Sequence, residues 1–195
     1  MKIKNFLILI GPPGSGKGTQ GKLLAPILNY NYLSLGQTLR DYAKGKEDEA
    51  KQVKKLINAG KIIPDAMISV ISHSAIKILP KAEGLILDGF PRDIDQTNIL
   101  DELISKYKVE RVKAVFIDVP KAKVLERLLH RKDSRTDDNA EVIETRFKEY
   151  DEKTHPILEY FDRQHKLIKI HGDQSIEQVH AEILKKLEHG HKIRI

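Results

Sequence analysis

The sequence contains no cysteine, and none of its apolar runs is long. The missing cysteines exclude disulfide bonds, thiol catalysis and thiolate metal sites, and they fit a reducing compartment. No apolar run approaches the roughly 20 residues that a membrane-spanning helix needs, and the short apolar stretch near the N-terminus lacks a small-residue cleavage site after it. We therefore expect a cytoplasmic protein that does not bind membranes.

Charge and size narrow the expectation further. The formal net charge is +6 over 195 residues, which would suit a nucleic-acid surface. However, Lys-rich segments such as residues 51–55 lie among acidic residues along expected helices, which favours solvated helix faces and no nucleic-acid partner. The hydrophobic content of 40% is enough for one compact domain whose core buries roughly 70% of the unfolded surface.

A glycine-rich segment, Gly11–Gln20, directly follows the all-apolar stretch Phe6–Ile10. This order predicts a strand that turns through a loop into a helix. In such a loop the backbone N–H groups point inward around an anion, the helix N-terminus adds its positive dipole, and the Lys17 ammonium reaches the terminal phosphates. The segment therefore predicts binding of a nucleoside triphosphate.

One position departs from the general phosphate-loop pattern. The residue after the lysine is usually Ser or Thr, whose hydroxyl binds magnesium, but here it is Gly18, and Thr19 follows one residue late. Two interpretations are open at this point. Either the loop is a chance cluster of glycines, or it belongs to a subclass that holds its metal mainly through phosphate oxygens and water.

Apolar runs of strand length recur along the chain and alternate with segments of helical spacing. The expected strands are residues 6–10, 85–87, 114–119 and 167–170, with a shorter one at 32–34. This alternation predicts β/α units around a parallel sheet, whose ligands bind at the carboxyl edge of the strands.

Two segments interrupt this alternation. Residues 36–79 read as several short helices, with a loop at 61–63 between a helix that ends at Gly60 and one that starts at Pro64. We interpret them as a flap over a second binding site. The charged residues 131–138 have little to bury and precede a helix that starts at Ala140, capped by Asn139, so we expect a mobile cover over phosphates.

Asp88 ends the apolar run 85–87, at the edge where a phosphate-loop enzyme usually carries its second acidic group. There it would hold magnesium or the water around it. The alternative is an ordinary turn or capping aspartate. Arg92 follows on the same edge, and an acid at a strand end together with a loop arginine would bracket a phosphate.

Taken in order, the motifs resemble those of the adenylate kinase family, within the nucleoside monophosphate kinases, over nearly the whole chain. The matching segments are Gly11–Gln20, Ser34–Arg40, Gly60–Pro64, Asp88–Gln96 and Arg135–Asp138. The glycine after the loop lysine is the form that this family has. The resemblance implies a P-loop NTPase fold of the α/β class, with three α/β/α layers and a five-stranded parallel sheet. It implies a single domain over residues 1–195, with a nucleoside-monophosphate-binding insert at about 35–64 and a short lid at about 131–138.

The resemblance also implies which residues form the site. ATP would be bound by Gly14, Ser15, Gly16, Lys17, Gly18, Thr19, Arg127, Arg131, Gly172 and Asp173. AMP would be bound by Leu35, Arg40, Lys61, Ile62, Ile63, Gly89, Arg92, Gln96, Arg135 and Arg146. The catalytic residues would be Lys17, Arg92, Arg131, Arg135 and Arg146, while Asp88 would hold Mg²⁺ through water, with a minor contribution from Thr19.

The implied activity is that of a phosphotransferase, which reversibly moves the γ-phosphoryl of Mg-ATP to AMP and gives two ADP. Such a transfer needs little covalent chemistry and much charge neutralisation, a task for which the planar guanidinium of arginine is suited. The acceptor phosphate is already an anion at neutral pH, so none of the eight histidines is needed as a base. We expect a monomer.

Departures from the family pattern leave two alternatives. Leu35 and Gln37 stand where adenylate kinases usually have Thr and Asp, and UMP/CMP kinases resemble this chain in their short lid and in an apolar residue at position 35. Gln96 favours AMP, because its amide can both donate and accept toward an adenine edge. A nucleotide-responsive RNA-binding protein is the second alternative, although the chain has no aromatic-interleaved basic stretch for stacking bases.

Overall fold

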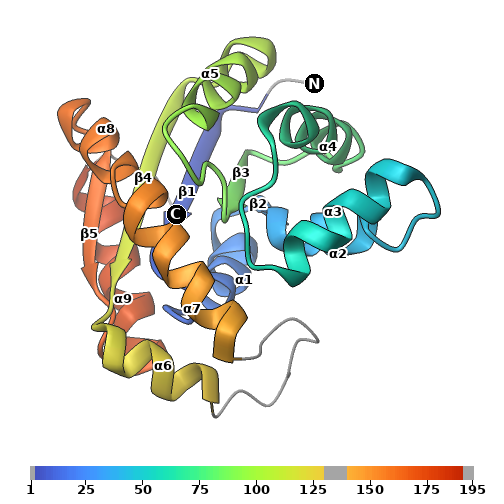
Figure 1. Ribbon diagram of the computed structural model, residues 1–195. Helices are drawn as coiled ribbons and strands as arrows, with labels where there is room; N and C mark the ends of the chain where they lie inside the picture. The colour runs from blue at the N-terminus through green and yellow to red at the C-terminus, as the bar shows by residue number, and fades with distance from the viewer. Residues whose placement is uncertain (1–2, 130–139, 191–195) are drawn as a thin grey trace.

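A computed structural model describes residues 3–129 and 140–190 of the chain. A five-stranded sheet with the strand order β2-β3-β1-β4-β5 runs through the centre of the molecule, and every pair of neighbouring strands is parallel (Figure 1). The strands are β1 (Asn5–Ile10), β2 (Tyr30–Ser34), β3 (Gly84–Asp88), β4 (Arg111–Asp118) and β5 (Leu167–His171). The predicted parallel α/β sheet is confirmed.

The central strands β3, β1 and β4 contain continuous apolar runs because both faces of the sheet are buried there. In β1, Phe6, Ile8 and Ile10 belong to one hydrophobic cluster, whereas the alternate residues Leu7 and Leu9 belong to the cluster on the opposite face. Successive side chains of a strand point to opposite faces, so a strand with a core on each side has no polar position in its middle.

Helices cover both faces and complete three layers. Helices α1, α6 and α9 contribute to one cluster, and α4, α5 and α8 contribute to the other. The helices are α1 (Lys17–Leu28), α2 (Leu35–Tyr42), α3 (Asp48–Asn58), α4 (Asp65–Lys77), α5 (Gln96–Tyr107), α6 (Lys121–Leu129), α7 (Ala140–Glu149), the π-helix η1 (Tyr150–Thr154), α8 (Ile157–Arg163) and α9 (Ile176–Gly190). Within the described ranges, none of them combines the length and apolarity that crossing a membrane requires.

Helices α2, α3 and α4 lie between β2 and β3, where the sequence predicts a helical insert. Helix α3 ends in a Schellman motif, in which Gly60 N–H donates to Ile57 O and Lys61 N–H donates to Leu56 O, each at 3.0 Å. Gly60 takes the left-handed conformation that this motif requires, with φ of +71°. Pro64 then precedes α4, so the predicted loop at 61–63 is confirmed.

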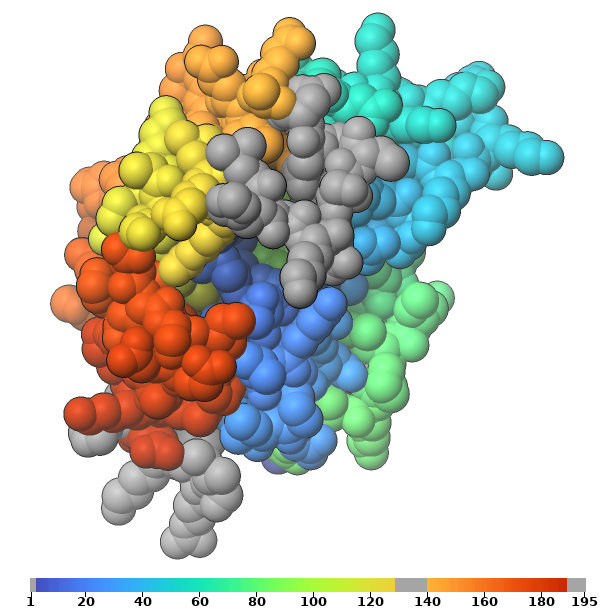
Figure 2. Space-filling view, turned by 90° about the horizontal axis from the view of Figure 1, so that it is seen from below, coloured from blue at the N-terminus to red at the C-terminus, as the bar shows by residue number. Residues whose placement is uncertain are grey.

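The order of the strands places ligand-binding loops at one edge. β1 lies in the middle of the sheet, with β3 and β2 on one side and β4 and β5 on the other. Ligands of open α/β sheets bind at the carboxyl ends of the strands, next to such a point where the strand order reverses. Figure 2 looks onto this end of the molecule. There the blue surface of the N-terminal segment lies between the yellow and red surfaces of α6 and α9 on one side and the cyan surface of the insert on the other.

Candidate active site

The loop after β1 has the shape of an anion cradle. Gly14 and Gly16 take positive φ values of 85° and 94°, and between them Ser15 N–H donates to Pro12 O at 3.1 Å, so the loop is a series of tight turns. Gly16 is the N-cap of α1, and a Cβ added to it would meet nothing within 4 Å among the described residues. Open space at a helix N-terminus, lined by backbone N–H groups, is suited to a phosphate.

The Lys17 ammonium lies over this loop. Its Nζ donates to Gly11 O at 2.7 Å and to Pro12 O at 2.9 Å, and it lies 3.4 Å from Ser15 Oγ. These carbonyls hold the charge at the mouth of the cradle, where phosphate oxygens would compete for its protons. The strand, the loop and the helix follow one another as predicted, and the binding of phosphate by Lys17 stays a prediction.

Asp88 lies at the carboxyl end of β3 and faces the start of α1. A Cβ added to Gly18 would lie 3.5 Å from Asp88 Oδ2 and 3.4 Å from Tyr32 Oη. The Tyr32 hydroxyl donates to Asp88 Oδ2 at 2.6 Å. Asp88 therefore lies next to Gly18, the residue that follows the loop lysine. It also lies at the end of β3, as the sequence predicts for a magnesium-side carboxylate.

Two arginines from different segments converge over Gly36. A Cβ added to Gly36 would lie 3.6 Å from Arg40 Nη1 and 3.7 Å from Arg92 Nη2. Arg40 comes from α2, where its Nη2 donates to Gln37 Oε1 at 2.9 Å, and Arg92 comes from the loop after β3. Two guanidinium groups that approach one small residue have the charge and the donors to bind a phosphate, and this role stays a prediction.

Arg92 is held by its neighbours on several sides. Its Nε donates to Gly89 O at 3.0 Å, and its backbone N–H donates to Gln96 Oε1 at 2.9 Å. Thr154, in the π-helix η1, donates its hydroxyl to Arg92 O at 2.6 Å. The guanidinium therefore extends from a backbone that is fixed by a segment 62 residues away along the chain.

Gln96 is fully buried, and two neighbours fix its amide orientation. Nε2 donates to Asp93 Oδ2 at 3.0 Å, while Oε1 accepts from Arg92 N–H. Asp93 also accepts from Gln96 N–H at the start of α5, at 2.9 Å. Burial raises the pKa of Asp93; the hydrogen bond from Gln96 N–H opposes this effect, and the nearby carboxylates of Asp65 and Asp95 add to it. One amide hydrogen and one oxygen lone pair of Gln96 remain for another partner.

On the other side of the loop, Arg127 meets the segment after β5. Arg127 Nη2 donates to Gly172 O at 3.0 Å, and Gly172 N–H donates to Asp118 O at 2.7 Å. Gln20, buried in α1, donates to Ile176 O at 2.9 Å and so ties the same segment to the helix of the phosphate loop. Arg127 and Gly172, which lie in α6 and after β5, are thus brought together next to the loop.

We expect Gly172→Ala to destabilise the protein by about 1–3 kcal/mol, because overpacking a tight contact forces the backbone to shift. A Cβ there would lie 2.6 Å from Ile117 Cγ2 and 2.8 Å from Asp118 O, and a backbone oxygen cannot rotate away. Thermal unfolding checks this prediction, with a drop of about 2–4 °C in Tm for each kcal/mol. An unchanged Tm of Gly172→Ala would contradict the packing account.

The remaining predicted residues of the second site fall into two groups. Arg146, in α7, lies against the insert, where a Cβ added to Gly60 would be 3.3 Å from Arg146 Cγ. Ile63 and Leu35 are buried in the hydrophobic core, with 3% and 2% of their surface exposed. Their predicted contact with an acceptor, and that of Lys61, Ile62 and Gly89, stays a prediction.

Part of the predicted site lies outside the described residues. This applies to Arg131, Arg135 and the whole predicted lid, and to the predicted cap Asn139. Helix α7 does begin at Ala140, as the sequence predicts. In the donor site, Thr19 is exposed on α1 and Asp173 is exposed after β5, whereas Ser15 is buried in the loop.

Three residues of the site are absent from the sequence prediction. Tyr32 binds Asp88, Asp93 orients Gln96, and Thr154 holds the backbone of Arg92. The acidic residue three positions before Gln96 is a helix-capping signal that could have indicated Asp93. No local pattern signals the roles of Tyr32 and Thr154, which depend on contacts distant in the sequence.

Comparisons with known proteins agree with this geometry. A sequence model of the family described as "Adenylate kinase" matches residues 9–166. The chain is 36% identical over 183 residues to an adenylate kinase of Leptospira biflexa serovar Patoc, which covers 93% of this chain and 98% of the relative. It is 30% identical over 210 residues to an adenylate kinase of Thermotoga petrophila, with 92% and 96% covered. The chain, with its phosphate loop, strand-end aspartate and paired arginines, belongs to the adenylate kinase family of phosphotransferases.

Proposed function

We propose that this protein transfers the γ-phosphoryl group of Mg-ATP to AMP and catalyses the reverse reaction between two ADP. The observation that supports this most directly is the presence of two groups of cationic side chains, each suited to a phosphate, in the loops after β1 and β3 and in α2. One is the loop with Lys17, and the other is the pair Arg40 and Arg92 over Gly36. Asp88 and Gly89 connect them, because Asp88 faces the loop and Gly89 accepts from Arg92 Nε.

On the donor side, the amides of the loop and the Lys17 ammonium would bind the β- and γ-phosphates. The adenine would lie against Arg127 and the backbone near Gly172, which the hydrogen bond between them holds next to α1. Arginine presents a flat charged surface on which a purine can stack. Arg131 would meet the donor phosphates; its role remains a prediction.

On the acceptor side, Arg40 and Arg92 would clamp the monophosphate, and Gln96 would read the base. The side-chain oxygen of Gln96 accepts from Arg92 N–H, and its nitrogen donates to Asp93. A flip of the amide would exchange the oxygen and the nitrogen and break both bonds. Adenine offers an N6–H donor beside the N1 acceptor, which matches the remaining oxygen lone pair and N–H of Gln96. A base with a carbonyl at that position offers the reverse order.

The residues around Asp88 fit a magnesium ion. Asp88 is a partly exposed carboxylate beside the phosphate loop, and Mg²⁺ prefers carboxylate and phosphate oxygens while keeping several of its own waters. Asp88 would hold the ion through water, with a minor contribution from Thr19. When bound with ATP, the metal neutralises part of the phosphate charge.

The transfer itself would be a direct in-line displacement in which the chain supplies alignment and positive charge. Lys17 would hold the transferring group from the donor side, and Arg92 would hold the attacking acceptor phosphate. Arg146 and Arg135 would close on the same group from α7 and from the lid. The monomeric state, the absence of a nucleic-acid partner and the cytoplasmic location stay predictions.

The test is a coupled assay of diphosphate formation from ATP with AMP, CMP, UMP and GMP as separate acceptors. We expect AMP to have the highest kcat/KM. A preference for CMP or UMP would refute AMP as the acceptor and support the pyrimidine kinase alternative, which the family assignment does not favour. No diphosphate from any acceptor, together with tight RNA binding, would support the RNA-binding alternative.

We expect Gln96→Ala to lower kcat/KM for AMP about 10- to 100-fold and to reduce the preference for AMP over UMP and GMP, because a bidentate pair with a base contributes about 1–3 kcal/mol to its discrimination. Cytosine offers the same donor and acceptor order as adenine, so the preference over CMP should change less. Steady-state kinetics with the same acceptors measures this effect. Asp93→Asn, which leaves Gln96 in place but weakens the hold on its amide, should reduce the preference less. Unchanged relative kcat/KM values in Gln96→Ala would remove Gln96 from base recognition.

A further inference from the structure

Tyr32 reaches the magnesium-side carboxylate from a neighbouring strand. It lies in β2, which pairs with β3 so that Ser34 is opposite Asp88, and Tyr32 is therefore two residues before that pair. Two residues of a strand span about 7 Å, a distance that a tyrosine side chain can bridge. The hydroxyl donates to Asp88 Oδ2 at 2.6 Å, which is the length of a charge-assisted O–H···O⁻ hydrogen bond.

Two glycines in the first turn of α1 make this approach possible. A Cβ added to Gly21 would lie 2.7 Å from Tyr32 Cδ2 and closer still to Cε2, so the ring packs directly on the helix backbone. Gly18 lies three residues earlier, on the same face of the helix. A Cβ added to Gly18 would lie 3.4 Å from Tyr32 Oη, so the hydroxyl fills the space next to this glycine.

In the general phosphate loop, position 18 carries the Ser or Thr whose hydroxyl binds the metal. A Cβ at position 18 would lie 3.4 Å from Tyr32 Oη and 3.5 Å from Asp88 Oδ2, so a hydroxyl carried on it would be next to both groups. We propose that Tyr32 is a positioning residue for Asp88: its hydroxyl, which comes from β2, takes the place beside Asp88 that a hydroxyl at position 18 would take, and it orients the carboxylate instead of binding the metal itself. This inference rests on the proposed function, in which Asp88 is the magnesium-side carboxylate.

The hydrogen bond has a defined effect on the site. It engages Oδ2 of Asp88 and thereby fixes the rotation of the carboxylate about its bond to the chain. The second oxygen is then presented in one orientation to a hydrated ion bound at the phosphate loop. Partners of this kind, which orient a metal-side group without touching the metal, typically contribute about 10- to 100-fold to metal affinity.

The first test is Tyr32→Phe, which removes the hydroxyl and keeps the ring against Gly21. The readout is the dissociation constant of Mn²⁺ from the complex of the full chain with the non-hydrolysable ATP analogue AMP-PNP, measured from the EPR signal of free Mn²⁺. We expect this constant to rise about 10-fold. An unchanged constant would overturn the proposal.

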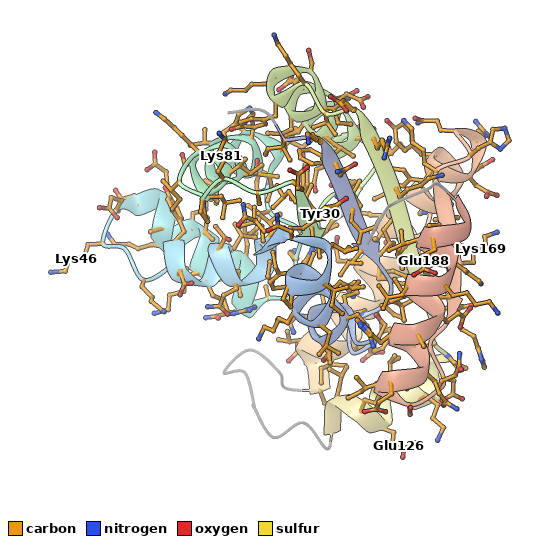
Figure 3. All side chains as sticks on the ribbon, turned by 180° about the vertical axis from the view of Figure 1, so that it is seen from behind. Tyr30, Lys46, Lys81, Glu126, Lys169 and Glu188 are labelled. Atoms are coloured by element: carbon orange, nitrogen blue, oxygen red, sulfur yellow. The ribbon has the colours of Figure 1, made fainter. Side chains whose placement is uncertain are left out.

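The matched control is Tyr30→Phe. Tyr30 begins β2, at the end of the strand remote from Asp88, where its ring packs on Gly84 (Figure 3). Tyr30→Phe also removes a tyrosine hydroxyl from β2, so a general effect of such a loss on the strand would appear in both variants. We expect Mn²⁺ affinity to change only in Tyr32→Phe; equal losses in the two variants would count against a specific role of Tyr32.

The second test restores a hydroxyl at the general position. In Tyr32→Phe the atom 3.4 Å from the Cβ position of residue 18 is gone, so Gly18→Ser has room in that background. The double variant Tyr32→Phe, Gly18→Ser should recover Mn²⁺ affinity to within about 3-fold of the unmodified chain, which is less than the loss expected for removing an orienting partner. Equal affinities of the single and double variants would refute the replacement of one hydroxyl by the other.

Asp88→Asn separates failure of this inference from failure of the proposed function. If Tyr32 acts through Asp88, Tyr32→Phe should have no further effect on Mn²⁺ affinity in the Asp88→Asn background, whereas two independent effects would add. Asp88→Asn with unchanged Mn²⁺ affinity would refute the metal assignment of Asp88 itself. A loss in Asp88→Asn with none in Tyr32→Phe would refute only the role of Tyr32.

Discussion

Replacing Lys17 with methionine is expected to lower kcat for ADP formation about 10²- to 10³-fold while the protein stays folded. The charge of Lys17 lies over the loop, held by the carbonyls of Gly11 and Pro12, and methionine keeps the length of the side chain without any donor. A single preorganised donor aimed at charge that develops in a transition state has an effect of this size. Steady-state kinetics with ATP and AMP measures it.

Stability must be followed in the same variant, because Lys17→Met also removes the hydrogen bonds to the loop. Those bonds lie at a partly exposed site where water can replace them, so we expect a loss of about 1 kcal/mol and a Tm lower by about 2–4 °C. Lys22→Met is the matched control, since Lys22 is exposed on the same helix. Near-normal turnover of Lys17→Met, with Lys22→Met unchanged, would refute the assignment of the phosphate loop.

The architecture could be predicted from the sequence because its signals are local. The central strands β3, β1 and β4 contain short apolar runs, and burial on both faces leaves such a run unbroken, as in Phe6–Ile10. The phosphate loop with Lys17 comes directly after the run in β1, and Asp88 comes directly after the run in β3. Because the strands are parallel, both places lie at the carboxyl edge of the sheet. Gly60 and Pro64 similarly mark the end and start of helices through their own backbone preferences.

The finer arrangement of the site could not be predicted, because it depends on contacts between distant segments. Tyr32 reaches Asp88 only through the register of β2 on β3 and through the absence of side chains at Gly18 and Gly21. Thr154 supports Arg92 from a π-helix, which no periodicity in the sequence indicates. The burial of Leu35 in the core also depends on the packing of α2, and its predicted contact with an acceptor stays a prediction.

Arg92→Lys is expected to lower kcat/KM for AMP about 10²-fold and to change KM for ATP by less than about 3-fold. Lysine keeps the charge, but it cannot donate to Gly89 O and to a phosphate at the same time with the planar geometry of a guanidinium. A misplacement of the acceptor by about 1 Å has a cost of this size in the transfer step. Initial rates with one substrate varied and the other saturating separate the two constants.

The contrast between the two substrates is what assigns Arg92 to the acceptor. Arg92 and Arg40 converge over Gly36, on the insert side of Asp88, while the loop and Lys17 lie on the other side. Arg163→Lys is the matched control, because Arg163 lies exposed on α8 and pairs only with Glu159 among the residues that the structure describes. If Arg92→Lys weakened ATP and AMP equally, Arg92 would serve the donor phosphates as well, and the separation of the two phosphate sites would have to be redrawn around Arg40 alone.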